Sequence, residues 1–258
     1  MRKNIKNKFY PIIFFAALLL IWEIISRSEV FPPFILPSPG SILVSLITDF
    51  TLMQYDILIT LYEALAGFII AIVLSVVIAV IMDSIIGFKK TLYPILIISQ
   101  TVPIIIIAPL FIIWFGYGYT PKIFIVTLIC FFPITISLLQ SLTAVDKELV
   151  DLLRSMGSNK LQIYKFVKIP SAMPGFFSGL KIAATYSIMG ATIGEWVGGK
   201  NGLGVYMIRA KQSFETDRVF AAIIVITILS ILILKIIEFA EKKNMPWLKI
   251  PDEYYIDQ

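Results

Sequence analysis

Residues 194–201, GEWVGGKN, nearly match a known phosphate-binding motif. They fit the pattern G-x-x-x-x-G-K-[ST] except at the last position, where Asn201 lacks the hydroxyl that would hold Mg²⁺. No strand–helix unit is predicted before them, which such a loop requires. The glycines are better explained by a sharp turn of the backbone. We therefore expect no nucleotide or other cofactor to bind here.

The residue types that most often catalyse reactions or bind metals are scarce in this chain. It has no His, which removes the commonest general base and the commonest metal ligand. Its single cysteine, Cys130, lies in an apolar run and can form neither a disulfide framework nor a thiolate metal site. We predict no catalytic residue and no metal site, and the sequence argues against a membrane enzyme.

A few polar side chains interrupt long apolar runs. An ionisable residue at the centre of a membrane helix costs about 2.5–3.5 kcal/mol, so Glu63 and Glu195 are functional candidates, although both lie near the ends of their runs. Gln100 and Thr101 precede Pro103 within one turn. They could contact a solute in the lumen, or equally form hydrogen bonds to a neighbouring helix.

The elements that must position these residues are membrane helices. The chain has 258 residues, of which 58% are hydrophobic and 15% charged, and a mean hydropathy of +0.89, so its natural solvent is a bilayer. A span needs about 20 mostly apolar residues. Six stretches qualify: 9–27, 57–82, 92–115, 122–141, 175–197 and 218–240. All should be helical, because backbone in lipid must satisfy its own hydrogen bonds.

Basic residues set the orientation of these spans. Four of them precede the first apolar run, which we interpret as an uncleaved first span, and this places the N-terminus in the cytoplasm. Lys89, Lys90, the segment after the fourth span and the C-terminal tail are also basic. One basic loop, between the fifth and sixth spans, is predicted outside. The net charge of +5 is thus explained by the bilayer, and nucleic acid is not an expected partner.

The polar segment from Asp151 to Gly175 predicts two short amphipathic helices. Apolar residues recur at helical spacing up to Met156, and Gly157 can end the first helix in the left-handed conformation. Ser158 or Asn159 can cap the next helix, which Pro170 should end. By pattern alone, this hairpin could lie on lipid headgroups or bind a cytosolic partner, with about equal weight.

This segment resembles the EAA loop of ATP-binding-cassette importer permeases. The family pattern is Glu-Ala-Ala, three residues, Gly, nine residues and Ile-x-Leu-Pro. This chain keeps that spacing, the Gly and the Pro, and departs from the pattern where Glu-Ala-Ala becomes Asp-Leu-Leu. The matching residues are Asp151, Leu152, Leu153, Gly157, Val167, Ile169 and Pro170. TVPIIIIAPLFIIWFGYG, FFPITI and IGEWVGGKNGLG look like the nitrate, sulfonate and taurine branch, which includes permeases for thiamine precursors and riboflavin-like vitamins. The resemblance covers about residues 60–237.

The resemblance implies how the protein works and with what. In this family the EAA loop, here about residues 143–173, seats in a groove of a cytosolic ATPase and couples its closure to the spans. ATP and Mg²⁺ then belong to an ATPase dimer, and this chain needs no cofactor of its own. An extracytoplasmic solute-binding protein and a second copy of the permease, or a paralogue, complete the assembly in the lipid membrane.

The fifth predicted span carries a stripe of small residues that has two explanations. Gly179, Ala183, Ser187 and Ala191 are spaced four apart, which allows close approach of another helix. The same stripe could line the pathway near the subunit interface, as the resemblance implies. The two explanations are compatible in a dimer.

The sequence therefore predicts an all-α, multi-pass permease of a prokaryotic cell membrane, with six spans and both termini cytoplasmic. Residues 1–8 form the N-terminus, 9–240 the six-span domain with its coupling loop, and 241–258 the tail. A secondary transporter would carry paired ionisable residues in its spans, which are nearly bare of charge here. The transmembrane component of an energy-coupling-factor vitamin transporter remains the other alternative, and the preserved EAA spacing argues against it.

Overall fold

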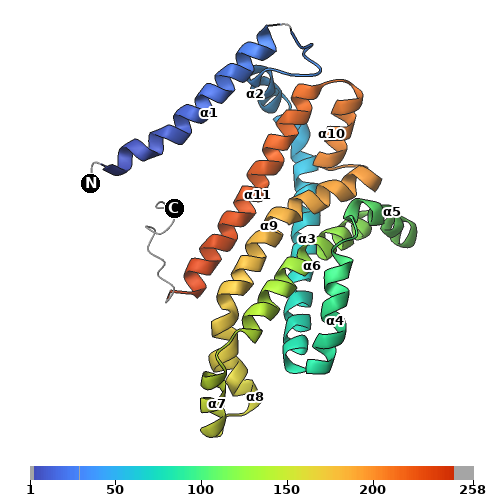
Figure 1. Cartoon of the computed structure of the whole chain (residues 1–258). Helices are drawn as coiled ribbons and strands as arrows, with labels where there is room; N and C mark the ends of the chain where they lie inside the picture. Colours follow the sequence, from blue (N-terminus) through green and yellow to red (C-terminus); the bar gives the residue numbers. More distant parts are fainter. Residues whose placement is uncertain (1–2, 29, 247–258) are drawn as a thin grey trace.

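The computed structural model describes residues 3–28 and 30–246, and these form an all-helical fold, as predicted. Helix α3, with 35 residues, is the longest of the described helices and runs through the middle of the bundle (Figure 1). The elements are α1 (Lys3–Arg27), α2 (Pro39–Thr48), α3 (Phe50–Ser84), α4 (Ile86–Ser99), α5 (Ile104–Phe115), α6 (Tyr119–Thr143), α7 (Lys147–Ser155), α8 (Lys160–Ile163), the π-helical η1 (Tyr164–Lys168), α9 (Ile169–Gly198), α10 (Leu203–Gln212) and α11 (Thr216–Asn244).

The core is formed by α3, α6 and α9, which lie against one another along most of their lengths (Figure 1). Glycines allow the close approach. A Cβ at Gly67 of α3 would lie 2.5 Å from Val126 Cβ on α6, and one at Gly179 of α9 would lie 2.9 Å from the carbonyl oxygen of Pro133 on α6. Small residues at such contacts bring helix backbones together where lipid gives no hydrophobic driving force.

Fewer helices are apolar and long enough to cross a membrane than the six predicted. Among the described residues these are α3, α6 and α11, with a fourth if the bent pair α4 and α5 counts as one span. The predicted first and fifth spans correspond to α1 and α9, which are continuous helices of 25 and 30 residues but do not belong to this set. The six-span count therefore stays a prediction.

The predicted third span, 92–115, is not one straight helix. Helices α4 and α5 meet at a bend of 103°, and neither is long enough to cross a bilayer alone. Pro103 takes an extended conformation directly before α5. Proline offers no N–H and disfavours the helical conformation for Val102 before it, so the helix cannot continue.

Helix α1 stands apart from the bundle. It touches α2, and Trp22 Nε1 donates to the carbonyl oxygen of Pro37, just before α2, at 3.0 Å. The Trp22 ring also lies 5.6 Å from that of Phe220 on α11, from which α1 otherwise diverges (Figure 1). Its apolar side chains from Ile12 to Ile25 are largely exposed. The predicted cytoplasmic N-terminus, 1–8, is helical from Lys3 onward, and residues 1–2 lie outside the described part of the chain. In the predicted tail, α11 continues to Asn244, and 247–258 are likewise outside it.

The predicted hairpin is present as α7, α8 and η1, and its local signals hold. Gly157 has φ +83°, with its N–H donating to the Arg154 carbonyl and that of Ser158 to Leu153, the paired bonds of a left-handed helix end. Asn159 caps α8 by accepting from the Gln162 N–H, and its own N–H donates in return to Gln162 Oε1, which completes a capping box.

The prediction that Pro170 ends the second helix is wrong. Helix α8 continues through η1 into α9, and Pro170 lies in the first turn of α9. The N–H of Ile169 donates to the Tyr164 carbonyl, five residues back. A π turn widens the helix directly before the proline, which relieves the clash of its ring with the preceding turn. The hairpin is therefore continuous with α9.

Candidate functional site

Two polar sites lie at opposite ends of the helical core, one beside the hairpin and one at the loop between α9 and α10. We call residues 147–168 the hairpin and residues 198–204 the glycine loop. Helix α3 reaches both, because Asp83 and Ser84 lie at its C-terminal end, and Asp56, Thr60 and Glu63 lie in its N-terminal half.

The hairpin projects from the core (Figure 1), and several of its apolar side chains are exposed. Leu152 is 57% exposed, Met156 73%, Leu161 81% and Phe166 62%. Val150 and Ile163 are the buried residues, on α7 and α8 respectively. The hairpin thus uses a few side chains to hold itself together and leaves a larger apolar surface uncovered, as surfaces that bind another protein do.

The residues that match the EAA loop all lie on or next to the hairpin. Asp151 and Leu152 are exposed, and Asp151 pairs with Arg154 at 3.0 Å on the surface of α7. Leu153, Val167 and Pro170 are half-buried, whereas Gly157 and Ile169 are exposed. Their coupling role is a prediction that geometry alone does not test.

A cluster of polar residues holds the hairpin to α3. Lys168 Nζ lies 2.6 Å from Asp83 Oδ2, and the Tyr164 hydroxyl donates to the same oxygen. The Tyr164 oxygen also lies 2.8 Å from Ser84 Oγ. The Asp83 side chain is only 2% exposed and that of Lys168 19%. We call Asp83, Tyr164 and Lys168 the clamp.

The clamp keeps its hydrogen-bond pattern at physiological pH. Burial raises the pKa of Tyr164 to about 12, and its hydrogen bond to Asp83 acts in the same direction. A phenolate facing a carboxylate would be repelled, so the hydroxyl stays protonated and donates.

At the opposite end, carboxylates bind the backbone of the glycine loop. The N–H of Gly202 donates to Asp56 at 2.6 Å, and the N–H of Gly204 to Glu195 at 2.6 Å. The N–H of Leu203 between them donates to Thr60 Oγ1 at 2.9 Å, and that hydroxyl donates in turn to Glu195 at 2.6 Å. Gly202, with φ +119°, can turn here without a side chain meeting Glu195.

An ion pair lies beside this loop in the core. Lys122 Nζ is 2.6 Å from Glu63 Oε1, and both side chains are almost fully buried. The second oxygen of Glu63 has no hydrogen-bond partner among the described residues. A buried charge needs such a counterion, because transfer from water is costly.

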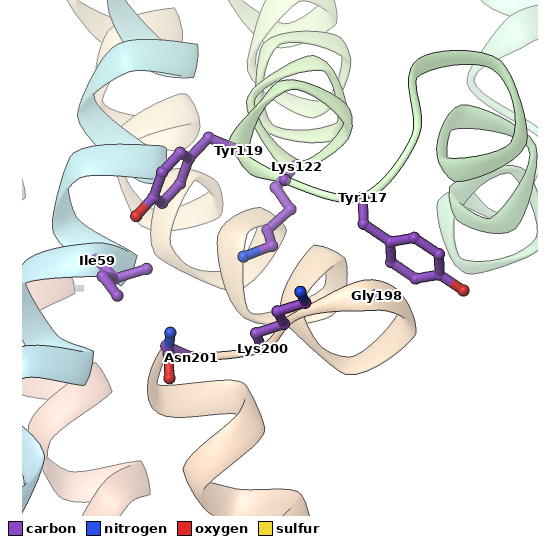
Figure 2. A pocket seen from close by; sticks show the side chains of 8 residues that line it. Ile59, Tyr117, Tyr119, Lys122, Gly198, Lys200 and Asn201 are labelled. Atoms are coloured by element: carbon purple, nitrogen blue, oxygen red, sulfur yellow. The ribbon is translucent and has the colours of Figure 1, made fainter.

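Above this ion pair lies a pocket of about 210 Å³. Figure 2 shows Lys122 pointing into it from α6, between Tyr119 and Tyr117, toward Lys200 and Asn201 of the glycine loop. Its wall combines the ammonium groups of two lysines and two phenols with apolar surface such as that of Ile59. The pocket is open, and three residues of the near-match to the phosphate-binding motif line it: Gly198, Lys200 and Asn201. Their glycines are explained by the turn and its bonds to carboxylates, and the absence of a nucleotide site stays a prediction.

The predicted pathway residues are placed as follows. Gln100 and Thr101 lie exposed in the bend between α4 and α5, and their side chains bond the carbonyls of Leu96 and Ile98 in their own helix. The stripe residues of α9, by contrast, are buried within one chain, as is Glu195. Gly179 faces α6, and the carbonyl of Ala183 accepts from Cys130 of α6 at 3.3 Å. The stripe residues are Gly179, Ala183, Ser187 and Ala191.

Sequence reasoning missed the clamp and most of the glycine-loop site. Asp83 and Lys168 are 85 residues apart, and no local pattern links them. Asp56 and Lys122 each fall at the edge of an apolar run, where a charge is usually explained by the membrane surface. Asp56, Glu63 and Lys122 are also ionisable groups next to spans, which is the signal that marks functional candidates.

Similar proteins place the chain among transport permeases. It is 35% identical to the formylaminopyrimidine transport permease protein ThiX of Halalkalibacterium halodurans, over 93% of this chain and 96% of that protein. It is 30% identical to the riboflavin transport system permease protein RibX of Chloroflexus aurantiacus, over 89% and 87%. The taurine permease TauC of Escherichia coli is 28% identical, over 90% and 87%. These relatives fall in the branch that the sequence motifs predicted.

A solved structure supports the same fold. The MetNI methionine ABC transporter in an inward-facing conformation aligns with a TM-score of 0.63 at 20% identity, over 77% of this chain and 96% of that one. The family model described as "Binding-protein-dependent transport system inner membrane component" matches residues 87–244, which include the hairpin and the glycine loop. The chain belongs to this family of membrane transport components.

Proposed function

We propose that this chain is the permease subunit of an ATP-driven importer for a small organic solute, and that two copies, or one copy and a paralogue, form the pathway. The observation that carries the proposal is the exposed apolar surface of the hairpin on a chain that matches importer permeases. The hairpin faces the cytoplasm and binds one subunit of an ATPase dimer. ATP and Mg²⁺ are bound by that ATPase, and solute is delivered by an extracytoplasmic binding protein.

The docking surface consists of Leu152, Met156, Leu161 and Phe166. Each is more than half exposed, and together they lie on a compact unit that is continuous with α9. An apolar surface of this kind loses contact with water when a groove covers it, which favours binding. Because α8, η1 and α9 are continuous, a movement of the docked hairpin is transmitted to α9 directly.

Co-purification of the ATPase tests the docking. Leu161→Glu places a charge on the surface and should abolish recovery of the ATPase with the tagged permease. Ile86→Glu is the matched control, since Ile86 is also an exposed apolar residue but lies outside the hairpin, at the start of α4. Equal recovery with both variants would show that the ATPase does not bind the hairpin.

Orientation is tested by cysteine labelling in intact cells. Asn159→Cys in the hairpin should resist a membrane-impermeant thiol reagent, and Lys200→Cys in the glycine loop should react. Both positions are at the surface, so exposure is not the difference. Asp49 would be a poor probe, because its side chain is buried against Arg218. Labelling of Asn159→Cys from outside would overturn the cytoplasmic placement of the hairpin and of both termini.

For the solute, we propose a thiamine-precursor pyrimidine first, with riboflavin-like vitamins and sulfonates such as taurine as the wider class. The order follows the identity of the relatives, of which the permease named for formylaminopyrimidine is the more similar. Uptake of labelled formylaminopyrimidine and of taurine, with the cognate ATPase and binding protein, tests it. Uptake of taurine alone would reverse the order.

A further inference from the structure

The clamp joins the hairpin to a helix other than the one into which it continues. Backbone runs from the hairpin into α9, but Tyr164 and Lys168 bond Asp83, at the end of α3. In the described part of the chain, apart from the helix cap by the adjacent Asp146, the side-chain hydrogen bonds and ion pairs that leave the hairpin all end on Asp83 or Ser84. The polar attachment of the hairpin to the core therefore rests on these two neighbouring residues, with Asp83 as its only carboxylate.

The local backbone is shaped to bring both donors to this carboxylate. Tyr164 and Lys168 are the first and last residues of η1, and the ammonium of Lys168 lies 5.1 Å from the centre of the Tyr164 ring. Both donors thus approach Asp83 from one side. π-Helical turns are rare and are concentrated at functional sites. A two-donor, charge-assisted contact is also stronger than a neutral one.

Helix α3 connects the clamp to the glycine loop. From Asp83 the same unbroken helix runs to Thr60 and Asp56, which bind the glycine loop at the other end of the molecule. Asp56 and Asp83 are 27 positions apart on this helix, which corresponds to about 40 Å at 1.5 Å per residue. A rigid helix held at both ends can carry a displacement from one site to the other.

We infer that Asp83, Tyr164 and Lys168 are positioning residues that tie the ATPase-docking hairpin to α3, so that ATPase closure moves α3 together with α9. This inference rests on the proposed function. It assigns the clamp a role in linking hydrolysis to transport, separate from docking itself, which is carried by the exposed apolar surface of the hairpin.

The test is transport per ATP in liposomes that contain the permease, its ATPase and its binding protein. Lys168→Met should leave ATPase recovery and ATP hydrolysis near wild type. It should lower the ratio of solute moved to ATP hydrolysed by about fivefold or more, which is the lower end of the typical range for coupling between two sites of a protein. Tyr164→Phe should lower the ratio less, since Lys168 still pairs with Asp83. Lys168→Arg keeps the charge and should restore the ratio.

Lys165→Met is the matched control. Lys165 lies on the same π turn and is exposed, and its ammonium faces Phe166, without a contact to Asp83. An unchanged ratio in Lys168→Met, equal to that of Lys165→Met, would overturn the inference. Loss of ATPase recovery in Lys168→Met would also overturn it, by showing that the clamp only builds the docking surface. Failure of the wild-type permease to recover an ATPase would instead contradict the proposed function.

Discussion

The glycine loop and the hairpin contrast in how firmly each is attached to the core. Three consecutive N–H groups of the glycine loop are bonded to side chains of α3 and α9, and a buried ion pair lies beside them. Side chains of the hairpin are bonded to the core only at Asp83 and Ser84 among the described residues, and the hairpin leaves most of its apolar surface uncovered. The glycine-loop end is built mostly from buried, hydrogen-bonded groups, whereas the hairpin, which we propose binds the ATPase, leaves apolar side chains exposed.

The largest expected effect is at the buried ion pair. Glu63→Ala would leave the ammonium of Lys122 without its hydrogen-bonded counterion, which should cost about 3–5 kcal/mol of the free energy of unfolding. Thermal unfolding in detergent measures it. Glu238→Ala is the control, because Glu238 pairs with Lys235 on an exposed part of α11 and should change stability little. Equal melting temperatures for the two variants would mean that Lys122 finds another partner.

Alanine substitution of one glycine with positive φ in each region should lower the melting temperature to different extents. Gly157 and Gly202 both have positive φ, so alanine strains the backbone by about 1–2 kcal/mol at either. A Cβ at Gly202 would also lie 2.2 Å from the Glu195 carboxyl, whereas nothing lies within 4 Å of one at Gly157. Gly202→Ala should therefore lower the melting temperature clearly more than Gly157→Ala. The reverse order would contradict the rigid glycine loop.

In the hairpin, the side chain at position 157 should matter for assembly more than for stability. Gly157→Val combines a left-handed conformation with a β-branched side chain and should misdirect α8, so that little ATPase is recovered. Gly157→Asn should recover more, since Asn adopts this conformation more readily. Membrane levels of both variants should match wild type. Full ATPase recovery with Gly157→Val would show that the bend is dispensable.

The smallest effect is expected at Lys200. Its position in the near-match to a phosphate-binding motif suggests nucleotide binding. However, its side chain is exposed at the pocket, and the glycine loop lies at the end of the molecule away from the hairpin (Figure 1). Lys200→Met should leave ATP hydrolysis by the assembled transporter unchanged. A nucleotide-binding assay on the purified permease is the complementary measurement. Loss of hydrolysis or binding of ATP would restore the motif as a functional site.

Features set by local contacts could be predicted from the sequence, whereas those set by long-range contacts could not. The helix end at Gly157 and the cap at Asn159 were predictable because their partners lie within five residues. A proline such as Pro103 favours a break in a helix, but the 103° bend depends on packing: Ile112 of α5 lies over Gly198, where a Cβ would be 2.4 Å away. No local pattern contains that contact.

Long-range polar contacts could not be predicted from the sequence for the same reason. In the clamp, Tyr164 and Lys168 lie 81 and 85 positions along the sequence from Asp83. The hydrogen-bonded residues Thr60 and Glu195 are 135 positions apart. Glu195 was a candidate from its charge alone, and its partners became evident only in the fold. Pro170 misled because the rule that proline ends a helix assumes an α-helical turn before it, whereas η1 provides a wider one.

The bend between α4 and α5 also bears on how the protein is made. At 14 and 12 residues, these helices extend about 21 and 18 Å, short of the roughly 30 Å hydrocarbon core. During synthesis they leave the ribosome before α6 and α9, which later cover α5. Before α6 and α9 are synthesised, neither α4 nor α5 is long enough to span the bilayer by itself. Biogenesis of this region therefore depends on helices encoded downstream, and a nascent chain that stopped before α9 would hold an incomplete membrane segment.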